Sequence, residues 1–335
     1  MKAVAAQKGT IGWIHADEPK LLAGHVRIRT EYSAISPGTE LSMAKKSADN
    51  PLAIGYSAVG IIEQVADDVT ELKIGQRVAC YGAPYVRHAE VLSVPVNLTA
   101  LVPEHVSPEE AAFAGLGAIA IHALRIADLR FGESLIIVGL GILGNISAQI
   151  AAAAAYTTLG YDLNADRVAI LRQSGFRHAY VSQADLEAGL WAATEGIGAD
   201  SVLLCASGDG ESLINSSLDW IRDRGKIIIV GDISTNFSRN KMFRKEAQVL
   251  ISRAGGPGRY DKQYEQDNKD YPIGYVRWTE GRNTREYIRL LAEKRISVQH
   301  LISGIYPIEQ AAEAYKNYSI SSSTMGTLIQ YPKYK

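Results

Sequence analysis

The chain has 335 residues, which is enough for two domains of ordinary size with a large buried core. Its 35 Lys and Arg residues nearly balance 36 Asp and Glu residues, and the net charge of −1 argues against nucleic acid or an anionic membrane as a partner. Two cysteines, Cys80 and Cys205, are too few for a four-cysteine zinc lobe, and with no predicted signal peptide or membrane span they indicate a cytoplasmic protein with buried thiols.

Short alternating strands characterise the first block, residues 1–120. Strands are predicted at residues 26–30, 59–65 and 77–80, and turn signals such as Ser36-Pro37-Gly38 separate them. Short strands with this spacing predict a small, mostly antiparallel β-domain.

Strands and helices alternate in the second block, residues 121–248. Strands are expected at residues 135–138, 158–161, 179–181, 201–205 and 226–231, with helices at 145–155, 165–174 and 211–221. A βαβ alternation of this kind predicts an α/β fold, in which helices cover both faces of a doubly wound parallel sheet.

The most informative motif lies where the first strand of this block ends. Residues 135–144 read LIIVGLGILG, an apolar strand that runs into G-x-G-x-x-G and then into a helix. The first glycine makes a tight turn, the second lets the backbone approach a pyrophosphate, and the third lets helix and strand pack closely. The helix N-terminus then presents free N–H groups to the phosphates. The predicted dinucleotide contacts are Gly139, Leu140, Gly141, Ile142, Leu143 and Gly144.

Asp162 ends the next strand, eighteen residues after Gly144, where an acidic side chain hydrogen-bonds an adenosine ribose. Its charge would repel the extra phosphate of NADP(H), so NAD(H) is the preferred cofactor, whereas the nearby Arg167 keeps NADP(H) open. Open α/β sheets also bind ligands at the carboxyl ends of later strands. Further cofactor contacts are therefore expected at Ala206, Val230, Gly231 and Asp232.

The third block, residues 249–335, holds two predicted helices, near 284–294 and 309–317, and a final strand at 326–330. Its segment 253–285 is dense in tyrosine and arginine, which can line a pocket for a polyhydroxylated or phosphorylated substrate. The substrate candidates are Arg253, Tyr271 and Trp278. The alternative is a solvated loop that tyrosine packing and ion pairs lock in place.

The order of the three blocks and four short motifs resembles the medium-chain dehydrogenase/reductase superfamily. The motifs are GQRV at 75–78, HAE at 88–90, EAAF at 110–113 and the glycine motif at 139–144. The resemblance covers essentially the whole chain. It implies a GroES-like β-barrel catalytic domain of residues 1–120 and 249–335, a Rossmann domain of residues 121–248, and a homodimer.

Zinc-binding members of this superfamily carry a G-x-C-G-[ST]-D turn, a Gly-His-Glu triplet and a third ligand before the central helix. Here the turn reads AISPGTE at 34–40, with Ser36 at the cysteine position, and the triplet reads Gly55-Tyr56-Ser57. The third site falls near residues 114–116, AGL, which offer no ligand. Because zinc requires three or four N, S or O ligands, the sequence predicts a zinc-independent protein with no metal site.

Within the zinc-independent branch, five stretches resemble the dehydrogenase half of bi-domain oxidoreductases. These stretches are residues 36–40, 55–60, 111–120, 258–261 and 270–280. The serine-for-cysteine turn is also similar to that of bacteriochlorophyllide dehydrogenases. The sequence stops at Lys335, before the sugar-oxidoreductase module that accompanies this half, so a coupled two-module reaction is not expected.

Hydride transfer to a carbonyl develops negative charge on oxygen, which hydrogen-bond donors can stabilise when no metal does so. Tyr56 replaces the family's histidine ligand, and its phenol can donate while neutral, although it could also simply fill space. Thr39 matches the family's hydroxyl relay position, and Ser36 is a third candidate. Glu40 is expected to hold its loop by hydrogen bonds, and His122 is expected to pack along its helix.

The leading functional hypothesis is an NAD(H)-dependent, zinc-independent alcohol dehydrogenase or ketone reductase. Its small-molecule substrate would be a sugar-like, cyclitol-like or other biosynthetic secondary alcohol. One alternative is an NADPH-dependent enone or quinone reductase. Another is a non-catalytic dinucleotide-binding subunit that serves a separate sugar oxidoreductase.

Overall fold

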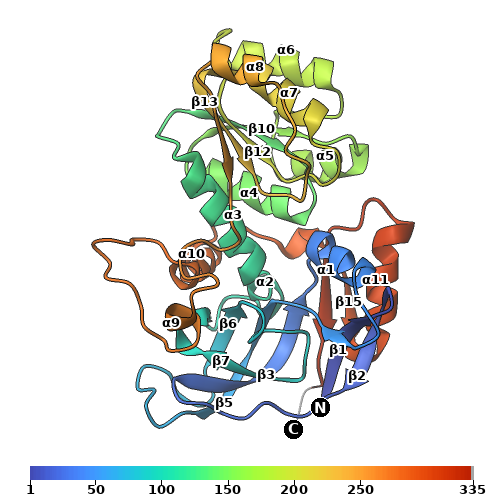
Figure 1. Cartoon of the computed structure of the whole chain (residues 1–335), viewed down its shortest axis with the longest axis vertical. Helices are drawn as coiled ribbons and strands as arrows, with labels where there is room; N and C mark the ends of the chain where they lie inside the picture. The colour runs from blue at the N-terminus through green and yellow to red at the C-terminus, as the bar shows by residue number, and fades with distance from the viewer. Residues whose placement is uncertain (333–335) are drawn as a thin grey trace. The chain divides into compact units, whose positions relative to one another are not determined.

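The computed structural model describes residues 1–332 and forms two compact units (Figure 1). One unit comprises Met1–Ala118 and Gly255–Lys335, and the other comprises Ile119–Ala254. The second boundary lies six residues beyond the predicted one, because strand β14 (Gln248–Ile251) pairs with the parallel sheet of the second unit. No helix within residues 1–332 is long and apolar enough to cross a membrane.

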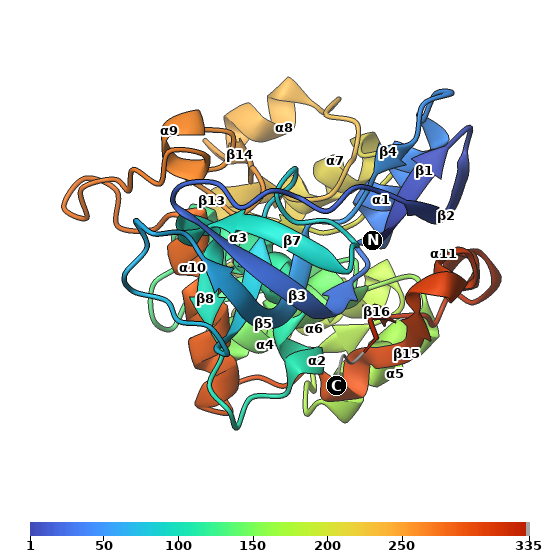
Figure 2. The ribbon, with the colours of Figure 1, turned by 90° about the horizontal axis from the view of Figure 1, so that it is seen from below.

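The first unit is built on a seven-stranded sheet. Its order is β15 (Ile302–Pro307), β16 (Gly326–Gln330), β3 (His25–Ala34), β5 (Ser57–Val65), β6 (Arg77–Tyr81) and β8 (Thr99–Leu101), with β7 (Val91–Pro95) paired to β3. All of these pairs are antiparallel except β15 with β16. Figure 2 looks onto this unit and shows β3, β5 and β7 side by side. The predicted antiparallel β-domain is confirmed.

A smaller sheet and several helices complete the first unit. The sheet has the antiparallel order β2 (Thr10–His15), β1 (Lys2–Gln7), β4 (Leu52–Ala53). The helices are α1 (Pro37–Lys45), α2 (Pro108–Ala111), α9 (Lys262–Glu265), α10 (Glu280–Ala292) and α11 (Ala311–Ile320), with 3-10 turns at Val96–Leu98, Gln299–Leu301 and Ile308–Gln310. Apolar side chains of α11 and β16 pack with Ile35 and Ile54 into one core cluster. This cluster supports the segment around α1.

The second unit is a six-stranded, wholly parallel sheet. Its order is β11 (Ala179–Tyr180), β10 (Thr157–Tyr161), β9 (Ser134–Val138), β12 (Ala199–Leu204), β13 (Ile221–Ile229) and β14. Counted along the chain, this order is 3-2-1-4-5-6, the doubly wound order of dinucleotide-binding sheets. The predicted Rossmann fold is confirmed.

Helices cover both faces of this sheet, so β9 is buried along its whole length. The helices are α3 (Ala114–Ala127), α4 (Ile142–Ala153), α5 (Ala165–Gln173), α6 (Gln183–Ala193), α7 (Glu211–Trp220) and α8 (Arg239–Arg244). In Figure 1, α6, α7 and α8 lie on one side of the strands, and α3 and α4 lie on the other. The helix α6 is missing from the sequence prediction.

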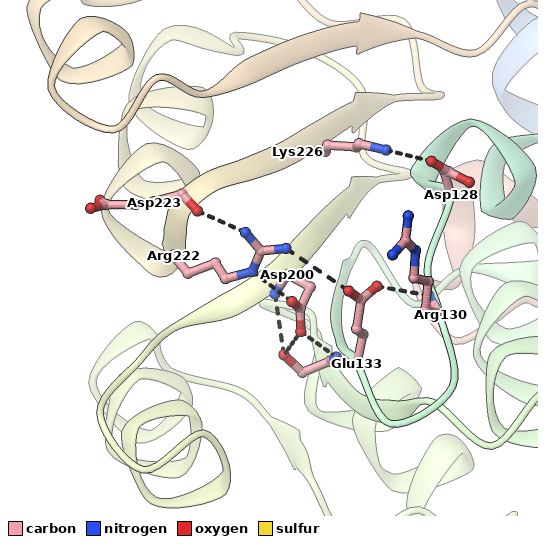
Figure 3. Close-up of polar contacts among 8 residues, drawn as sticks. Asp128, Arg130, Glu133, Asp200, Arg222, Asp223 and Lys226 are labelled. Atoms are coloured by element: carbon pink, nitrogen blue, oxygen red, sulfur yellow. Dashed lines mark hydrogen bonds and ion pairs between the residues drawn. The ribbon is translucent and has the colours of Figure 1, made fainter.

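A polar network joins the amino-terminal ends of three neighbouring strands (Figure 3). Both the backbone N–H and the hydroxyl of Ser134 donate to one carboxylate oxygen of Asp200, at 2.7 and 2.9 Å. The other oxygen accepts from Arg222 Nε at 2.6 Å, and Arg222 also lies 3.9 Å from Glu133. The network lies at the edge of the sheet opposite the glycine motif, because Ser134 begins the strand that the motif ends.

Replacing Asp200 with alanine is expected to reduce the free energy of unfolding by about 1–3 kcal/mol, because Arg222 and the Ser134 N–H lose a charged partner. Burial alone would raise the pKa of Asp200, but hydrogen bonds from Arg222 and Ser134 outweigh it and lower that pKa. The contribution is therefore complete above the unfolded-state pKa, near 4, and is lost as the pH falls through the lower folded-state value.

Urea unfolding of the wild type and the Asp200→Ala variant at pH 7 and at pH 3 measures this difference. Asp219→Ala is the matched control, because Asp219 pairs with Lys241 at a half-exposed position of α7. This replacement should lower the free energy of unfolding by less than about 0.5 kcal/mol. An equal loss at both pH values would contradict the assignment.

Candidate active site

The glycine motif forms the turn between β9 and α4. Gly139 has φ +88°, a left-handed backbone that favours glycine, and its N–H donates to the carbonyl of Tyr161 at 2.8 Å. Gly144 lies so close to this turn that a Cβ there would overlap the carbonyl oxygen of Gly139. Gly141 is the N-cap of α4 and leaves space for a Cβ. The first helix turn therefore packs directly on the loop, with backbone N–H groups at its open end.

Asp162 and Arg167 lie beside this loop. One carboxylate oxygen of Asp162 accepts from the N–H of Leu140 at 2.7 Å, and the other accepts from the N–H of Asn164 at 2.8 Å. The guanidinium of Arg167 lies 3.5 Å from the carboxylate and 3.9 Å from where a Cβ on Gly141 would stand. The structure thus brings the predicted acidic residue, its basic neighbour and the glycine loop together, as a dinucleotide site requires.

The other predicted cofactor contacts lie at the same edge of the sheet. The N–H groups of Val230 and Gly231 donate to the carbonyl of Leu204, at 3.0 and 2.9 Å. A Cβ on Gly231 would overlap the carbonyl oxygen of Ala206, so the loops after β12 and β13 touch. The side chain of Asp232 is exposed. These loops flank the point where the strand order reverses, where such sheets bind ligands.

The three predicted catalytic residues come together in the first unit. The Tyr56 hydroxyl donates to Ser36 Oγ at 2.5 Å, and it also hydrogen-bonds Thr39 in the first turn of α1. Ser36 is the N-cap residue of α1, yet its side chain makes no capping hydrogen bond and serves Tyr56 instead. The half-buried Tyr56 ring packs edge-on against Tyr81, with the ring centroids 5.8 Å apart.

The surroundings of Tyr56 keep its phenol protonated. Burial raises the pKa of Tyr56 well above its usual value, and the negative charge of Glu40 raises it further. Hydrogen bonds with Ser36 and Thr39 and the positive charge of Arg259 offset part of this rise. Tyr56 is therefore a neutral hydrogen-bond donor throughout the physiological pH range.

Sequence reasoning missed a buried polar network beside these residues. Glu40 and His88 are fully buried, and His88 Nε2 lies 3.1 Å from Glu40 Oε2. His88 Nδ1 is 2.6 Å from Ser33 Oγ, which is 2.7 Å from the hydroxyl of Tyr331. Tyr315 on α11 donates to the same oxygen of Glu40. We call these five residues the Glu40 network; no local sequence pattern indicates it, because its members come from distant parts of the chain.

The donor set near Tyr56 does not fit zinc. Ser36, Thr39 and Tyr56 offer neutral hydroxyls, and the carboxylate of Glu40 is already hydrogen-bonded to buried partners. Within residues 1–332, no three His, Cys, Asp or Glu side chains are grouped so that they could hold a metal ion. A tetrahedral zinc site needs three or four ligands held ready for the metal, and these side chains do not supply such a set.

The predicted substrate residues lie in both units. Tyr271 stacks on Tyr264 at 5.5 Å and donates its hydroxyl to Asp261, so it locks its own loop. In the same unit, the Trp278 ring lies 3.9 Å from the guanidinium of Arg277. Arg253 is exposed in the second unit, after β14. For Tyr271, the structure shows the packing contacts that the alternative interpretation of this segment predicts.

His122 lies on the part of α3 that belongs to the second unit. Burial lowers the pKa of His122 to about 4, and the positive charges of Arg125 and Arg253 contribute to the shift. Its imidazole is therefore neutral at physiological pH.

Comparisons with known proteins agree with this architecture. Residues 22–120 match the alcohol dehydrogenase GroES-like domain, and residues 143–267 match the zinc-binding dehydrogenase family. The chain is 25% identical to D-guloside 3-dehydrogenase of Escherichia coli K12, over 95% of each chain. It is 26% identical to D-arabitol-phosphate dehydrogenase of Enterococcus avium, over 94% of this chain and 93% of that protein.

Solved structures share the fold over nearly the whole chain. The alcohol dehydrogenase TADH from Thermus sp. ATN1 superposes with a TM-score of 0.80 at 20% identity, covering 99% of this chain and all of that one. Galactitol-1-phosphate dehydrogenase from Escherichia coli superposes with a TM-score of 0.80 at 18% identity, covering 98% of this chain and 100% of that one. Together with the dinucleotide-binding sheet and its glycine motif, these matches show that the chain is an NAD(P)-dependent oxidoreductase of the medium-chain dehydrogenase/reductase type.

Proposed function

We propose that this protein is a zinc-independent, NAD(H)-preferring dehydrogenase of sugar-like or polyol-like secondary alcohols, which also reduces the corresponding ketones. The observation that carries this proposal is the cluster of three hydroxyl groups of Ser36, Thr39 and Tyr56, in which Ser36 and Tyr56 stand at two positions where zinc-binding relatives would place metal ligands. The names of the relatives, which act on a guloside, an arabitol phosphate and a galactitol phosphate, support a polyhydroxylated substrate. A homodimer is proposed from the family resemblance, and a cytoplasmic location from the cysteine usage and the N-terminal sequence.

In this proposal, residues of the second unit would bind the cofactor, and residues of the first unit would act on the substrate oxygen. The glycine loop and Asp162 would hold the dinucleotide, whose nicotinamide supplies or accepts the hydride. Tyr56 would donate a hydrogen bond to the substrate oxygen, whose negative charge grows as hydride is transferred to a carbonyl. For this the single Tyr56 proton would turn from Ser36 to the substrate oxygen, while Ser36 and Thr39 donate to the phenol oxygen and offer hydroxyls through which the alcohol proton can move to water.

The cofactor preference should depend on the charge of Asp162. In Asp162→Asn, the amide oxygen can still accept from one backbone N–H, but the charge that repels the 2′-phosphate of NADPH is gone while Arg167 remains. We expect NADH to bind about 10-fold more weakly and the ratio of the two affinities to move at least 10-fold toward NADPH, since one charged hydrogen bond is involved.

Fluorescence titration with NADH and NADPH measures both dissociation constants. Asp166→Asn is the matched control, because Asp166 is an exposed acid in the first turn of α5. A ratio that stays unchanged in Asp162→Asn would exclude Asp162 as the determinant of cofactor choice.

The proposed activity is tested by oxidation of a panel of sugar alcohols and polyol phosphates with NAD⁺, using protein dialysed against a chelator. Turnover that survives chelation supports zinc independence, whereas loss of turnover with recovery on adding zinc would overturn it. NADPH-dependent reduction of enones or quinones without polyol oxidation would favour the reductase alternative. Tight NADH binding with no turnover on any substrate class would favour a non-catalytic subunit.

A further inference from the structure

Two donors meet at one oxygen of Glu40. A carboxylate can only accept, so His88 Nε2 and the Tyr315 hydroxyl both donate to Glu40 Oε2. On the far side of the imidazole, His88 Nδ1 is hydrogen-bonded to Ser33 Oγ, which is in turn hydrogen-bonded to the Tyr331 hydroxyl.

Burying the Glu40 carboxylate in the interior of the domain has a large free-energy cost. The other oxygen, Glu40 Oε1, is fully buried and has no hydrogen-bond partner among residues 1–332. Taking a carboxylate out of water costs several kcal/mol, and only well-placed partners recover that cost. Replacing a whole buried network of this kind by apolar side chains is often neutral or stabilising, so packing alone does not require the carboxylate, and its presence points to a further role.

The network is joined to the candidate active site by backbone contacts on both sides. Glu40 follows Thr39 in the first turn of α1, and its N–H donates to the carbonyl of Ser36 at 3.0 Å. On the other side, the His88 N–H donates to Ile54 at 2.9 Å, and the imidazole lies against Gly55. Gly55 has φ +106°, and a Cβ there would stand 2.7 Å from His88 Cδ2. Glu40 and His88 thus hold together the two segments that carry the hydroxyl cluster.

We propose that Glu40 is a positioning residue, whose carboxylate, bound by His88 and Tyr315, holds the first turn of α1 against the 54–56 segment and keeps the Tyr56 hydroxyl in place beside Ser36 and Thr39. Tyr56 faces charge from two directions: Glu40 on α1, and Arg259 on the segment before α9, with opposite effects on its pKa. Tyr81 on β6 supplies a neutral ring. The catalytic meaning of this role rests on the proposed function, but the test below does not.

The test replaces Tyr56 with a fluorinated tyrosine of lower intrinsic pKa and follows its titration by ¹⁹F NMR in the ligand-free protein. Glu40→Gln keeps the shape of the side chain and an oxygen acceptor but removes the charge. We expect the pKa of the label to fall by about 1 unit, because a like charge near an acid disfavours its ionisation. Glu90→Gln is the matched control: Glu90 is a buried acid of the same unit that acts on Tyr331. The proposal would be overturned if the pKa of the fluorinated tyrosine were unchanged in Glu40→Gln, or if it shifted equally in Glu90→Gln.

Tyr315→Phe is the second variant, in case Glu40→Gln fails to fold. Removing the phenol hydroxyl takes away one of the two hydrogen bonds that hold Glu40 Oε2, so the carboxylate and the first turn of α1 are held less firmly and the ¹⁹F shift of the label should change. No shift in this variant would likewise count against the proposal.

Kinetics provide an independent readout once a substrate is known. Glu40→Gln is expected to lower kcat at least 10-fold and to leave the KM for NADH within about twofold, because the cofactor loop lies in the other unit. Glu40→Asp, which restores the charge, should recover part of kcat. A parallel fall in kcat and in cofactor binding would indicate general damage to the fold. If no polyol is turned over, the proposed function fails while the ¹⁹F titration remains decisive for Glu40.

Discussion

Alanine at Gly144 is expected to abolish NADH binding and to lower the melting temperature of the protein by several degrees. A Cβ there would overlap the carbonyl oxygen of Gly139, a backbone atom that can move only if α4 shifts away from β9. Overpacking of this kind typically costs 1–3 kcal/mol or more, and the shift would also displace the N–H groups at the start of the helix. Thermal unfolding and an NADH titration measure the two effects.

Gly141→Ala, in the same motif, is expected to weaken NADH binding without lowering the melting temperature. A Cβ on Gly141 meets only the Arg167 guanidinium, at 3.9 Å, and the backbone of Gly141 is in the extended region that any residue adopts. This variant should therefore keep the wild-type melting temperature while binding NADH at least 10-fold more weakly, because the new methyl group stands where a pyrophosphate approaches. Equal stability of both variants would contradict the packing argument for Gly144.

Phenylalanine at Tyr56 is expected to lower kcat by 10²–10³-fold, the usual loss when one oxyanion donor is removed. The ring and its contact with Tyr81 are retained, so only the hydroxyl and its hydrogen bond to Ser36 are lost. The free energy of unfolding should change by about 1 kcal/mol or less, and NADH affinity should stay within a factor of two.

Steady-state oxidation of the best polyol, with single-turnover measurement of the hydride step, tests this prediction. Tyr81→Phe is the matched control: it removes a neighbouring phenol hydroxyl, which accepts from Gly255 N–H and is not assigned to the substrate. Unchanged turnover in Tyr56→Phe would remove the proposed donor and with it the mechanism.

Local sequence patterns predict most of the second unit. Apolar runs of strand length that alternate with helices can bury both faces only as a parallel sheet, and the structure has this sheet, with the further helix α6 after β11. The glycine motif and Asp162 were readable for the same reason, since each follows directly from the strand before it. The sequence predicts no strand at residues 248–251, because the short edge strand β14 carries little pattern of its own.

The role of single polar residues in the first unit depended on the tertiary structure. Glu40 is hydrogen-bonded to His88, 48 residues away in the sequence, and to Tyr315, 275 residues away. The hydroxyl of Tyr271 donates a hydrogen bond to Asp261. Such pairs follow from strand register and from the return of the C-terminal segment to the β-domain, neither of which periodicity encodes.

The sequence by itself therefore determined the class of enzyme and the dinucleotide-binding sheet, and it predicted hydroxyl residues, Ser36 and Tyr56, at two of the family's metal-ligand positions. Only the tertiary structure decided that Tyr56, Ser36 and Thr39 form one hydrogen-bonded cluster and that a buried carboxylate stands beside it. The physical reason is the sequence separation over which each kind of interaction acts. Strand, turn and helix signals act between near neighbours, whereas a buried charge is placed by partners that reach it from several distant segments of the chain.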